Sequence, residues 1–187
     1  MLVSRSPRRI EILTRAGIPF IVRPADVDET PHPDENPLSY SLRVAEDKAL
    51  AVEAAPEEIV LGADTIVAIG NEILGKPADD TDAARMLRRI SGRRHDVITG
   101  LCIRFGDRII RDSARTSVWF AELSPQEITE YVASGEPSDK AGAYAIQGLA
   151  SKFVERIDGC YSNVVGLPIA LVYRYLRDLA GPAAVHL

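Results

Sequence analysis

Asp64 lies inside an otherwise apolar run, residues 59–69, with the sequence IVLGADTIVAI. A buried carboxylate without a partner costs several kcal/mol, so Asp64 should pair with a cation, bind a metal, or lie where a strand meets a solvated cleft. Catalytic carboxylates of α/β proteins are often placed at such strand ends. The run therefore indicates a catalytic carboxylate, and the alternative is an Asp that is hydrogen-bonded in a bend beside Gly62.

A second group of candidate residues lies in the stretch SRSPRR, residues 4–9. Ser6 can cap a helix and Pro7 suits the first helical position, which predicts a loop that leads from a short strand into a helix. Backbone N–H groups and the helix dipole favour an anion there, whereas Arg8 and Arg9 are disfavoured in a first turn without an anion. With two serine hydroxyls, the stretch indicates a phosphate site. Solvated surface arginines and a basic disordered leader are the alternatives.

Cationic and amide side chains further along the chain could complete such a site. Lys76 precedes Pro77, so its backbone is held extended and its ammonium can be aimed. Residues 139–148, DKAGAYAIQG, combine small residues that allow close backbone approach with Gln147, whose amide can read a base edge. A glycine-rich loop alone is weak support for a site. Lys48 lies on the predicted polar face of a helix and by itself indicates only a surface charge.

Candidate metal ligands are carboxylates rather than histidines or cysteines. Asp28 and Glu29 lie in an acidic, proline-rich loop and could join Asp64 at a divalent cation, since carboxylate oxygens suit Mg²⁺ or Mn²⁺. Taken alone, the two loop residues are better explained as surface charges. The three histidines share no metal or triad spacing, the two cysteines form no CxxC or Cys/His pattern, and a GxSxG motif is absent.

Composition indicates one globular domain and excludes several classes of partner. The chain has 187 residues, of which 46% are hydrophobic and 26% charged, enough for one sizeable core. A formal charge of −5 argues against a nucleic-acid polymer as the main partner, because such binding needs a broad basic surface. No apolar run approaches the roughly 20 residues that cross a bilayer, and Ile10–Arg15 is amphipathic, unlike a secretory signal. We therefore expect no membrane partner, and the two widely separated cysteines, which indicate no disulfide framework, suit a cytoplasmic protein.

The predicted elements alternate between strands and helices. Strands are expected at residues 1–3, 20–23, 59–69, 95–105, 108–123, 144–146 and 153–157. Helices are expected to begin near Ser6, Asn36, Asp80, Ser124 and Pro168. Gly106 and Asp107 indicate a hairpin, and Ser124 with Glu127 forms a capping-box pattern. The pattern predicts an α/β domain with a mixed sheet.

Four ordered stretches, LVSRSPRRIEIL, LGADTIVAIGNEILGKP, SGEPSDKAGAYAIQG and NVVGLPI, resemble the Maf family of nucleoside triphosphate pyrophosphatases. The resemblance runs from the first residues to about Leu179. It implies a cytoplasmic enzyme that cleaves a nucleoside triphosphate between its α and β phosphates with Mg²⁺, Mn²⁺ or Co²⁺, and a homodimer as a family-level expectation. It also implies one Maf-like domain over residues 1–187, a mixed twisted β-sheet with flanking helices in two lobes around a central cleft.

The resemblance assigns roles residue by residue. The family's general base maps onto Asp64, which would hold the metal with Glu29, and Lys76 joins these two in catalysis. Substrate contacts map onto Ser4, Ser6, Arg8, Arg9, Lys48, Thr65, Lys140 and Gln147. Three of these, Arg8, Thr65 and Gln147, match residues associated with dTTP and UTP specificity, whereas the sister subfamily acting on 7-methyl-GTP has SPWR, SDQ and SEG at these places. Val3 and Cys160 depart from the family pattern by small swaps that affect local packing.

Other functions remain open at this point. An inosine triphosphate pyrophosphatase has a related architecture, but its SxNxxK opening is missing here. Maf proteins are also described as septum-formation inhibitors, so a non-enzymatic nucleotide-binding regulator is the second alternative. Asp64 and Lys76 favour an enzyme, because a protein that only binds nucleotide gains nothing from a general base. Within the enzyme interpretation, the substrate could be dTTP, UTP or a modified pyrimidine nucleotide.

Overall fold

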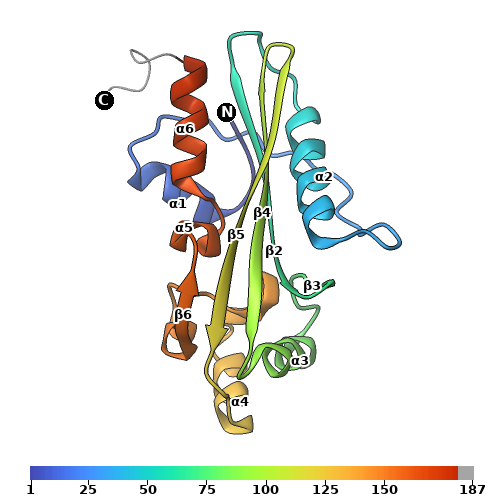
Figure 1. Cartoon of the computed structure of the whole chain (residues 1–187), viewed down its shortest axis with the longest axis vertical. Helices are drawn as coiled ribbons and strands as arrows, with labels where there is room; N and C mark the ends of the chain where they lie inside the picture. The colour runs from blue at the N-terminus through green and yellow to red at the C-terminus, as the bar shows by residue number, and fades with distance from the viewer. Residues whose placement is uncertain (181–187) are drawn as a thin grey trace. The chain divides into compact units, whose positions relative to one another are not determined.

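Runs of β-branched and aromatic residues form a six-stranded mixed sheet in the computed structural model, which describes residues 1–180 (Figure 1). The strand order is β1-β2-β4-β5-β6, and β3 pairs with β2 off this path. β1 is parallel to β2, whereas β2 with β3 and β5 with β6 are antiparallel. The bounds are β1 (Leu2–Val3), β2 (Ile59–Ile69), β3 (Glu72–Leu74), β4 (Arg94–Phe105), β5 (Arg108–Phe120) and β6 (Val154–Asp158). The predicted mixed α/β fold is confirmed.

Five of the described helices begin close to the predicted starts, whereas the short helix Tyr161–Val165 was not predicted. The helices are α1 (Pro7–Arg15), α2 (Pro37–Leu50), α3 (Asp80–Ile90), α4 (Pro125–Ala133), α5 (Tyr161–Val165) and α6 (Ile169–Ala180). Three short 3₁₀ helices, η1 (Glu136–Asp139), η2 (Ala141–Ala143) and η3 (Leu149–Phe153), lie between α4 and β6. Among the described residues, no helix has the length and apolar character needed to span a membrane.

Two sequence predictions of local structure are wrong. Residues 144–146 form no strand, although all three are buried. Residues 20–23 contribute only an isolated parallel bridge, Leu2 with Val22, although two backbone hydrogen bonds tie this segment to Leu2. Both segments carry the apolar residues typical of strands, but neither has a full ladder of backbone partners, and burial alone does not make a strand.

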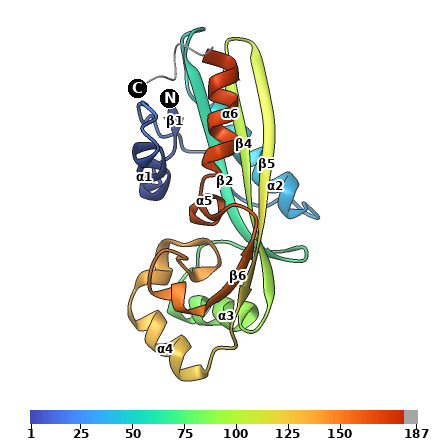
Figure 2. The same ribbon diagram turned by 60° about the vertical axis from the view of Figure 1, so that its left-hand side comes forward.

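The chain forms two compact units, and β2, β4 and β5 each contribute residues to both. Unit 1 contains Met1–Asp64, Thr99–Ala114 and the chain from Gly166 onward, and unit 2 contains Thr65–Ile98 and Arg115–Val165. In unit 1, alternate strand residues face opposite sides of the sheet. Val60 and Cys102 pack with α2, whereas neighbouring Leu61 and Leu101 share a core with residues of α1 and α6 (Figure 2). The core of unit 2 lies around α3 and α4.

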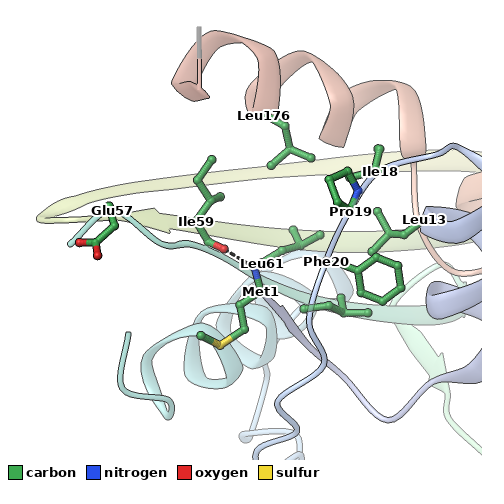
Figure 3. Close-up of a pocket in the computed structure, with 10 residues that line it drawn as sticks. Met1, Leu13, Ile18, Pro19, Phe20, Glu57, Ile59, Leu61 and Leu176 are labelled. Carbon is green, nitrogen blue, oxygen red and sulfur yellow. Dashed lines mark hydrogen bonds between the residues drawn. The ribbon is translucent and has the colours of Figure 1, made fainter. Parts of the chain in front are cut away.

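A small apolar pocket lies in unit 1 (Figure 3). Its volume is about 230 Å³. It is lined by Met1, Leu2, Leu13, Ile18, Pro19, Phe20, Glu57, Ile59, Leu61 and Leu176. The lining offers one carboxylate, and its one cation, the amino group of Met1, donates to the Ile59 carbonyl at 2.6 Å. Its lining is therefore unsuited to a polyanion, and the polar candidates lie elsewhere.

Candidate active site

The opening loop joins β1 to α1 beside Asp64. Val3 pairs with Gly62 in the parallel β1–β2 register, so the chain leaves β1 where β2 approaches Asp64. The hydroxyl of Ser4 is buried and accepts hydrogen bonds from the Ser6 N–H at 3.1 Å and from Arg9 Nη1 at 3.2 Å. A serine hydroxyl that accepts two hydrogen bonds still has its own proton to donate. Ser4 can therefore act as a donor toward an anion.

Ser6 occupies the N-cap position of α1, but its side chain makes no capping hydrogen bond, so this part of the prediction is wrong. Pro7 stands in the first turn as predicted, and the first turn contains no acidic residue. Gly17 lies in the left-handed region at φ 67° just after the helix, as expected of a helix stop. Without a cap from Ser6 or an acidic neighbour in the first turn, the N-terminus of α1 keeps the electrostatic character that favours an anion.

Arg9 is a buried cation. Only 7% of the residue is exposed, and its Nε donates to the carbonyl of Gly166 at 2.9 Å. Burial lowers the pKa of the Arg9 guanidinium from its ordinary value, and the negative charge of Asp64 opposes that shift. Desolvating a charge is costly unless other groups compensate for the lost water. The surroundings of Arg9 therefore favour an additional negative group.

Lys48 joins the two carboxylates predicted to act together. Its Nζ lies 2.8 Å from Asp64 Oδ1 and 2.8 Å from Glu29 Oε1. The prediction that Lys48 lies on a polar helix face is wrong, because its side chain is only 11% exposed. Asp64 is also buried, in a strand that continues without the bend of the alternative interpretation. Asp64 thus has the cationic partner that its apolar surroundings require.

The loop that carries Glu29 is fixed to α2 by two residues that the sequence analysis missed. The Tyr40 hydroxyl donates to the Glu29 carbonyl at 2.7 Å, and burial raises the pKa of Tyr40 to about 12. Arg43 donates to the Thr30 carbonyl at 3.1 Å and to both carboxylate oxygens of Glu35 at 2.7 and 2.8 Å. The Arg43 hydrogen bonds lower the pKa of Glu35 to about 2. No local sequence signal marks these residues, since their partners lie across a long loop.

The carboxylates present fit a cation that is shared with substrate. Asp64 and Glu29 meet at Lys48, whereas Asp28 accepts a hydrogen bond from the Thr30 N–H at 2.8 Å. Across residues 1–180, no group of three or more His, Cys, Asp or Glu residues could hold a metal ion alone. Mg²⁺ is commonly bound through one or two carboxylates, with waters and substrate phosphates as its other ligands. The donor set matches that type of site.

Unit 2 carries the other four candidates. Thr65 directly follows Asp64 in β2, and Lys76 is exposed two residues after β3. The Gly142 N–H donates to the Gly75 carbonyl at 3.0 Å, which joins the Lys76 segment to the loop that bears Lys140. The structure therefore brings Lys76 and the predicted glycine-rich loop onto adjoining segments.

The glycine-rich loop presents its two polar candidates differently. The Lys140 ammonium donates to the Glu136 carbonyl at 3.0 Å and pairs with Asp139, and its side chain is 17% exposed. Gln147 is exposed. Unit 1 thus contains two groups in contact, Ser4 with Arg9 and Lys48 with Glu29 and Asp64, and the charge of Asp64 acts on Arg9. Ser6 precedes α1 and Arg8 lies in its first turn, whereas Thr65, Lys76, Lys140 and Gln147 lie in unit 2.

His95 is buried against Tyr144 of this loop. Its Nε2 lies 2.9 Å from the Tyr144 hydroxyl, and its ring packs edge-on against Phe120 and Tyr144. Burial lowers the pKa of His95 from 6.5 to about 4. The histidine is therefore a neutral part of the core at physiological pH.

This buried histidine makes folding stability depend on pH. Because the pKa of His95 is lowered in the folded state, unfolded chains bind the proton first, so its contribution falls from pH 6.5 toward pH 4. The free energy of unfolding should lose about 3 kcal/mol over this range on account of His95. Denaturant titrations at several pH values should show that the free energy of unfolding changes less steeply with pH in His95→Gln than in the wild type. Equal slopes for His95→Gln and the wild type would contradict the assignment.

Comparison with known proteins shows a similarity that extends over nearly the whole chain. A sequence profile of the family described as Maf-like protein matches residues 1–179. A curated relative from Geobacter metallireducens, named dTTP/UTP pyrophosphatase, is 52% identical over 182 residues, which cover 96% of this chain and 95% of the relative. Relatives of the same name from Koribacter versatilis and Anaeromyxobacter sp. are 51% and 50% identical. The alignment with the Koribacter relative covers 95% of this chain and 92% of that relative, and the alignment with the Anaeromyxobacter relative covers 97% and 90%.

The residues matched by the family profile include all the candidate site residues of unit 1 and unit 2. They contain the opening loop, the strand with Asp64, the segment with Lys76 and the loop with Gln147. They also extend over both compact units. On this match and the identity to its relatives, the chain belongs to the Maf family.

Proposed function

We propose that this protein hydrolyses dTTP and UTP to the nucleoside monophosphate and pyrophosphate. The names of relatives at about 50% identity support this substrate class. The structural observation that carries the proposal is the buried Asp64–Lys48 pair at 2.8 Å, with the charge of Asp64 acting on the buried Arg9. A carboxylate kept among cations suits attack by water on a polyanion, because the cations compensate the charge of substrate and base together.

The cations bind the triphosphate. A nucleoside triphosphate carries about four negative charges, and their neutralisation is the main electrostatic requirement for its hydrolysis. Ser4, Ser6 and the N–H groups at the start of α1 donate hydrogen bonds to phosphate oxygens. The positively charged contacts are Arg8, Arg9, Lys48, Lys76 and Lys140. Thr65 and Gln147 contact the pyrimidine, and Arg8 contributes to the choice of base.

Asp64 orients the attacking water and accepts its proton. Lys48 engages Oδ1, which leaves Oδ2 to receive the proton. A divalent cation, Mg²⁺, Mn²⁺ or Co²⁺, would be held by Asp64 and Glu29 and would supply further charge neutralisation at the phosphates. A cytoplasmic location, a homodimer and a single catalytic domain over residues 1–187 belong to the same proposal and rest on the family resemblance.

Pyrophosphate release across a panel of triphosphates tests the proposal. We expect dTTP and UTP to be hydrolysed at least about tenfold faster, in kcat/KM, than ATP, ITP or 7-methyl-GTP, because Gln147 and Thr65 favour a pyrimidine. Modified pyrimidine triphosphates in the panel would define the preferred substrate. EDTA should abolish release, and Mg²⁺, Mn²⁺ or Co²⁺ should restore it. Preference for ITP would identify the inosine triphosphate class, and nucleotide binding without pyrophosphate release would identify a non-enzymatic regulator.

A further inference from the structure

One residue, Glu136, contacts the loop that carries Lys140 and Gln147 through both its carboxylate and its backbone carbonyl. Its Oε2 accepts a hydrogen bond from the Leu149 N–H at 2.9 Å, and its Oε1 accepts one from the Ala150 N–H at 3.3 Å. Its backbone carbonyl accepts a hydrogen bond from the Lys140 ammonium at 3.0 Å. Glu136 therefore makes contacts at both ends of the loop.

Tyr131 of α4 links Glu136 to the middle of the loop through hydrogen bonds. The hydroxyl of Tyr131 donates to Glu136 Oε1 at 2.7 Å and accepts from the Ala145 N–H at 3.2 Å. Tyr131 is 3% exposed, and its ring lies edge-on to Phe153. A buried hydroxyl with both a donor and an acceptor partner is fixed in orientation. The loop backbone is thus bound two residues before Gln147 and two residues after it.

Gly148 reflects how closely the carboxylate approaches the backbone. A Cβ atom at this position would lie 2.0 Å from Glu136 Oε2. Any side chain would therefore displace the carboxylate from the Leu149 and Ala150 N–H groups. Glycine directly after Gln147 leaves room for Glu136 under the loop, which is a role in packing rather than in backbone conformation.

The loop depends on these contacts because it has little regular structure of its own. Residues 144–148 belong to no helix or strand, yet Tyr144 to Ile146 are buried. Buried backbone N–H groups need acceptors, and the Tyr131 hydroxyl supplies one to the Ala145 N–H in place of a neighbouring strand. Gln147 is exposed within this fixed backbone. A defined backbone around an exposed amide is what reading a base by hydrogen bonds requires.

We propose that Glu136 is a positioning residue, whose carboxylate fixes the backbone around Gln147 for substrate binding and does not itself touch the nucleotide. This inference rests on the proposed pyrimidine triphosphate as ligand. Glu136 acts through the backbone N–H groups of Leu149 and Ala150 and through the Tyr131 hydroxyl. Loss of its carboxylate should weaken binding and base preference, while Asp64 and the cations of unit 1 are unaffected.

Glu136→Gln is the sharpest test, because it keeps the size of the side chain and replaces one acceptor oxygen by a donor. We expect KM for dTTP to rise about tenfold, kcat to change by less than about threefold, and the preference for dTTP over ATP to fall by about tenfold. Glu130→Gln is the matched control, since Glu130 is an exposed carboxylate of α4 that accepts a hydrogen bond from the Gln126 side chain at 2.8 Å. The control should match the wild type in all three quantities.

Tyr131→Phe provides a second, milder variant. It removes only the hydroxyl between Glu136 and the Ala145 N–H, so we expect the same direction of change and a KM increase of about threefold. Equal loss of kcat for all substrates without a change in KM or preference, in both variants, would overturn a positioning role. So would wild-type kinetics in Glu136→Gln.

Hydrogen exchange and binding separate this inference from the proposed reaction. Amides of Ala145, Leu149 and Ala150 should exchange faster in Glu136→Gln, and dTTP should bind about tenfold more weakly when the change is made in an Asp64→Asn background. Both measurements are independent of turnover. If the wild type hydrolyses no triphosphate, the reaction is wrong while the positioning role is still decided by dTTP affinity. Unchanged exchange and unchanged affinity would refute the role of Glu136 even in an active enzyme.

Discussion

Asp64→Asn should lower kcat for pyrophosphate release by about 10³-fold and leave the affinity for dTTP within about threefold. An amide is close in size to a carboxylate and can still accept a hydrogen bond from Lys48, but it cannot take a proton from water. Lys48 also keeps Glu29, 2.8 Å away, as an ionic partner. The loss should therefore fall on the chemical step rather than on binding. Steady-state kinetics with dTTP, combined with calorimetric binding of dTTP, measure the two quantities separately.

Asp26→Asn is the matched control for this substitution. Asp26 belongs to the same unit, and its side chain is 82% exposed in an ion pair with Arg5. Exposed ion pairs contribute little to stability, so this variant should retain wild-type kcat and a wild-type melting temperature. Full activity in Asp64→Asn would remove Asp64 from the reaction. A large loss of dTTP affinity with little change in kcat would instead make Asp64 a binding residue.

Sequence reasoning succeeded where structure is determined by near neighbours. The positions Ala83, Met86, Leu87 and Ile90, spaced as on one helix face, are all buried in α3. The capping box at Ser124 forms as expected, with reciprocal hydrogen bonds to the third residue of α4. Helix periodicity and capping involve residues within four positions of one another, so the sequence alone contains the needed information.

Prediction failed where a distant partner changes the character of a residue. Lys48 was expected in water, but Asp64 makes a buried position favourable for it. The two residues are 16 positions apart along the chain, so local periodicity could not relate them. Residues 144–146 have the composition of a strand, but the oxygen of Tyr131 replaces a neighbouring strand as the acceptor for the Ala145 N–H. Tyr40, Arg43 and Glu136 were missed for the same reason.

Gly100→Ala should lower the free energy of unfolding by about 3 kcal/mol and the melting temperature by about 10 °C. Gly100 lies in β4, where a glycine normally weakens the strand unless another backbone approaches closely. Here an added Cβ would lie 2.2 Å from the Ser41 carbonyl oxygen and 2.6 Å from the Leu42 nitrogen, both backbone atoms of α2. Because no flexible side chain can move aside, α2 itself would have to shift. Thermal and denaturant unfolding measure the loss.

Gly75→Ala is the matched control for stability, because nothing lies within 4 Å of a Cβ there. The free energy of unfolding of this variant should lie within about 0.5 kcal/mol of that of the wild type.

Gly100→Ala should also reduce activity below the temperature at which it unfolds, since α2 carries Lys48 and a shift of the helix moves the ammonium away from Asp64. Gly62 of β2 also allows α2 to approach closely, because a Cβ at this position would lie 2.1 Å from the Ala45 carbonyl oxygen. If Gly100→Ala were as stable as Gly75→Ala, α2 could not rest directly on the sheet, and the buried Lys48–Asp64 pair would lose its structural basis.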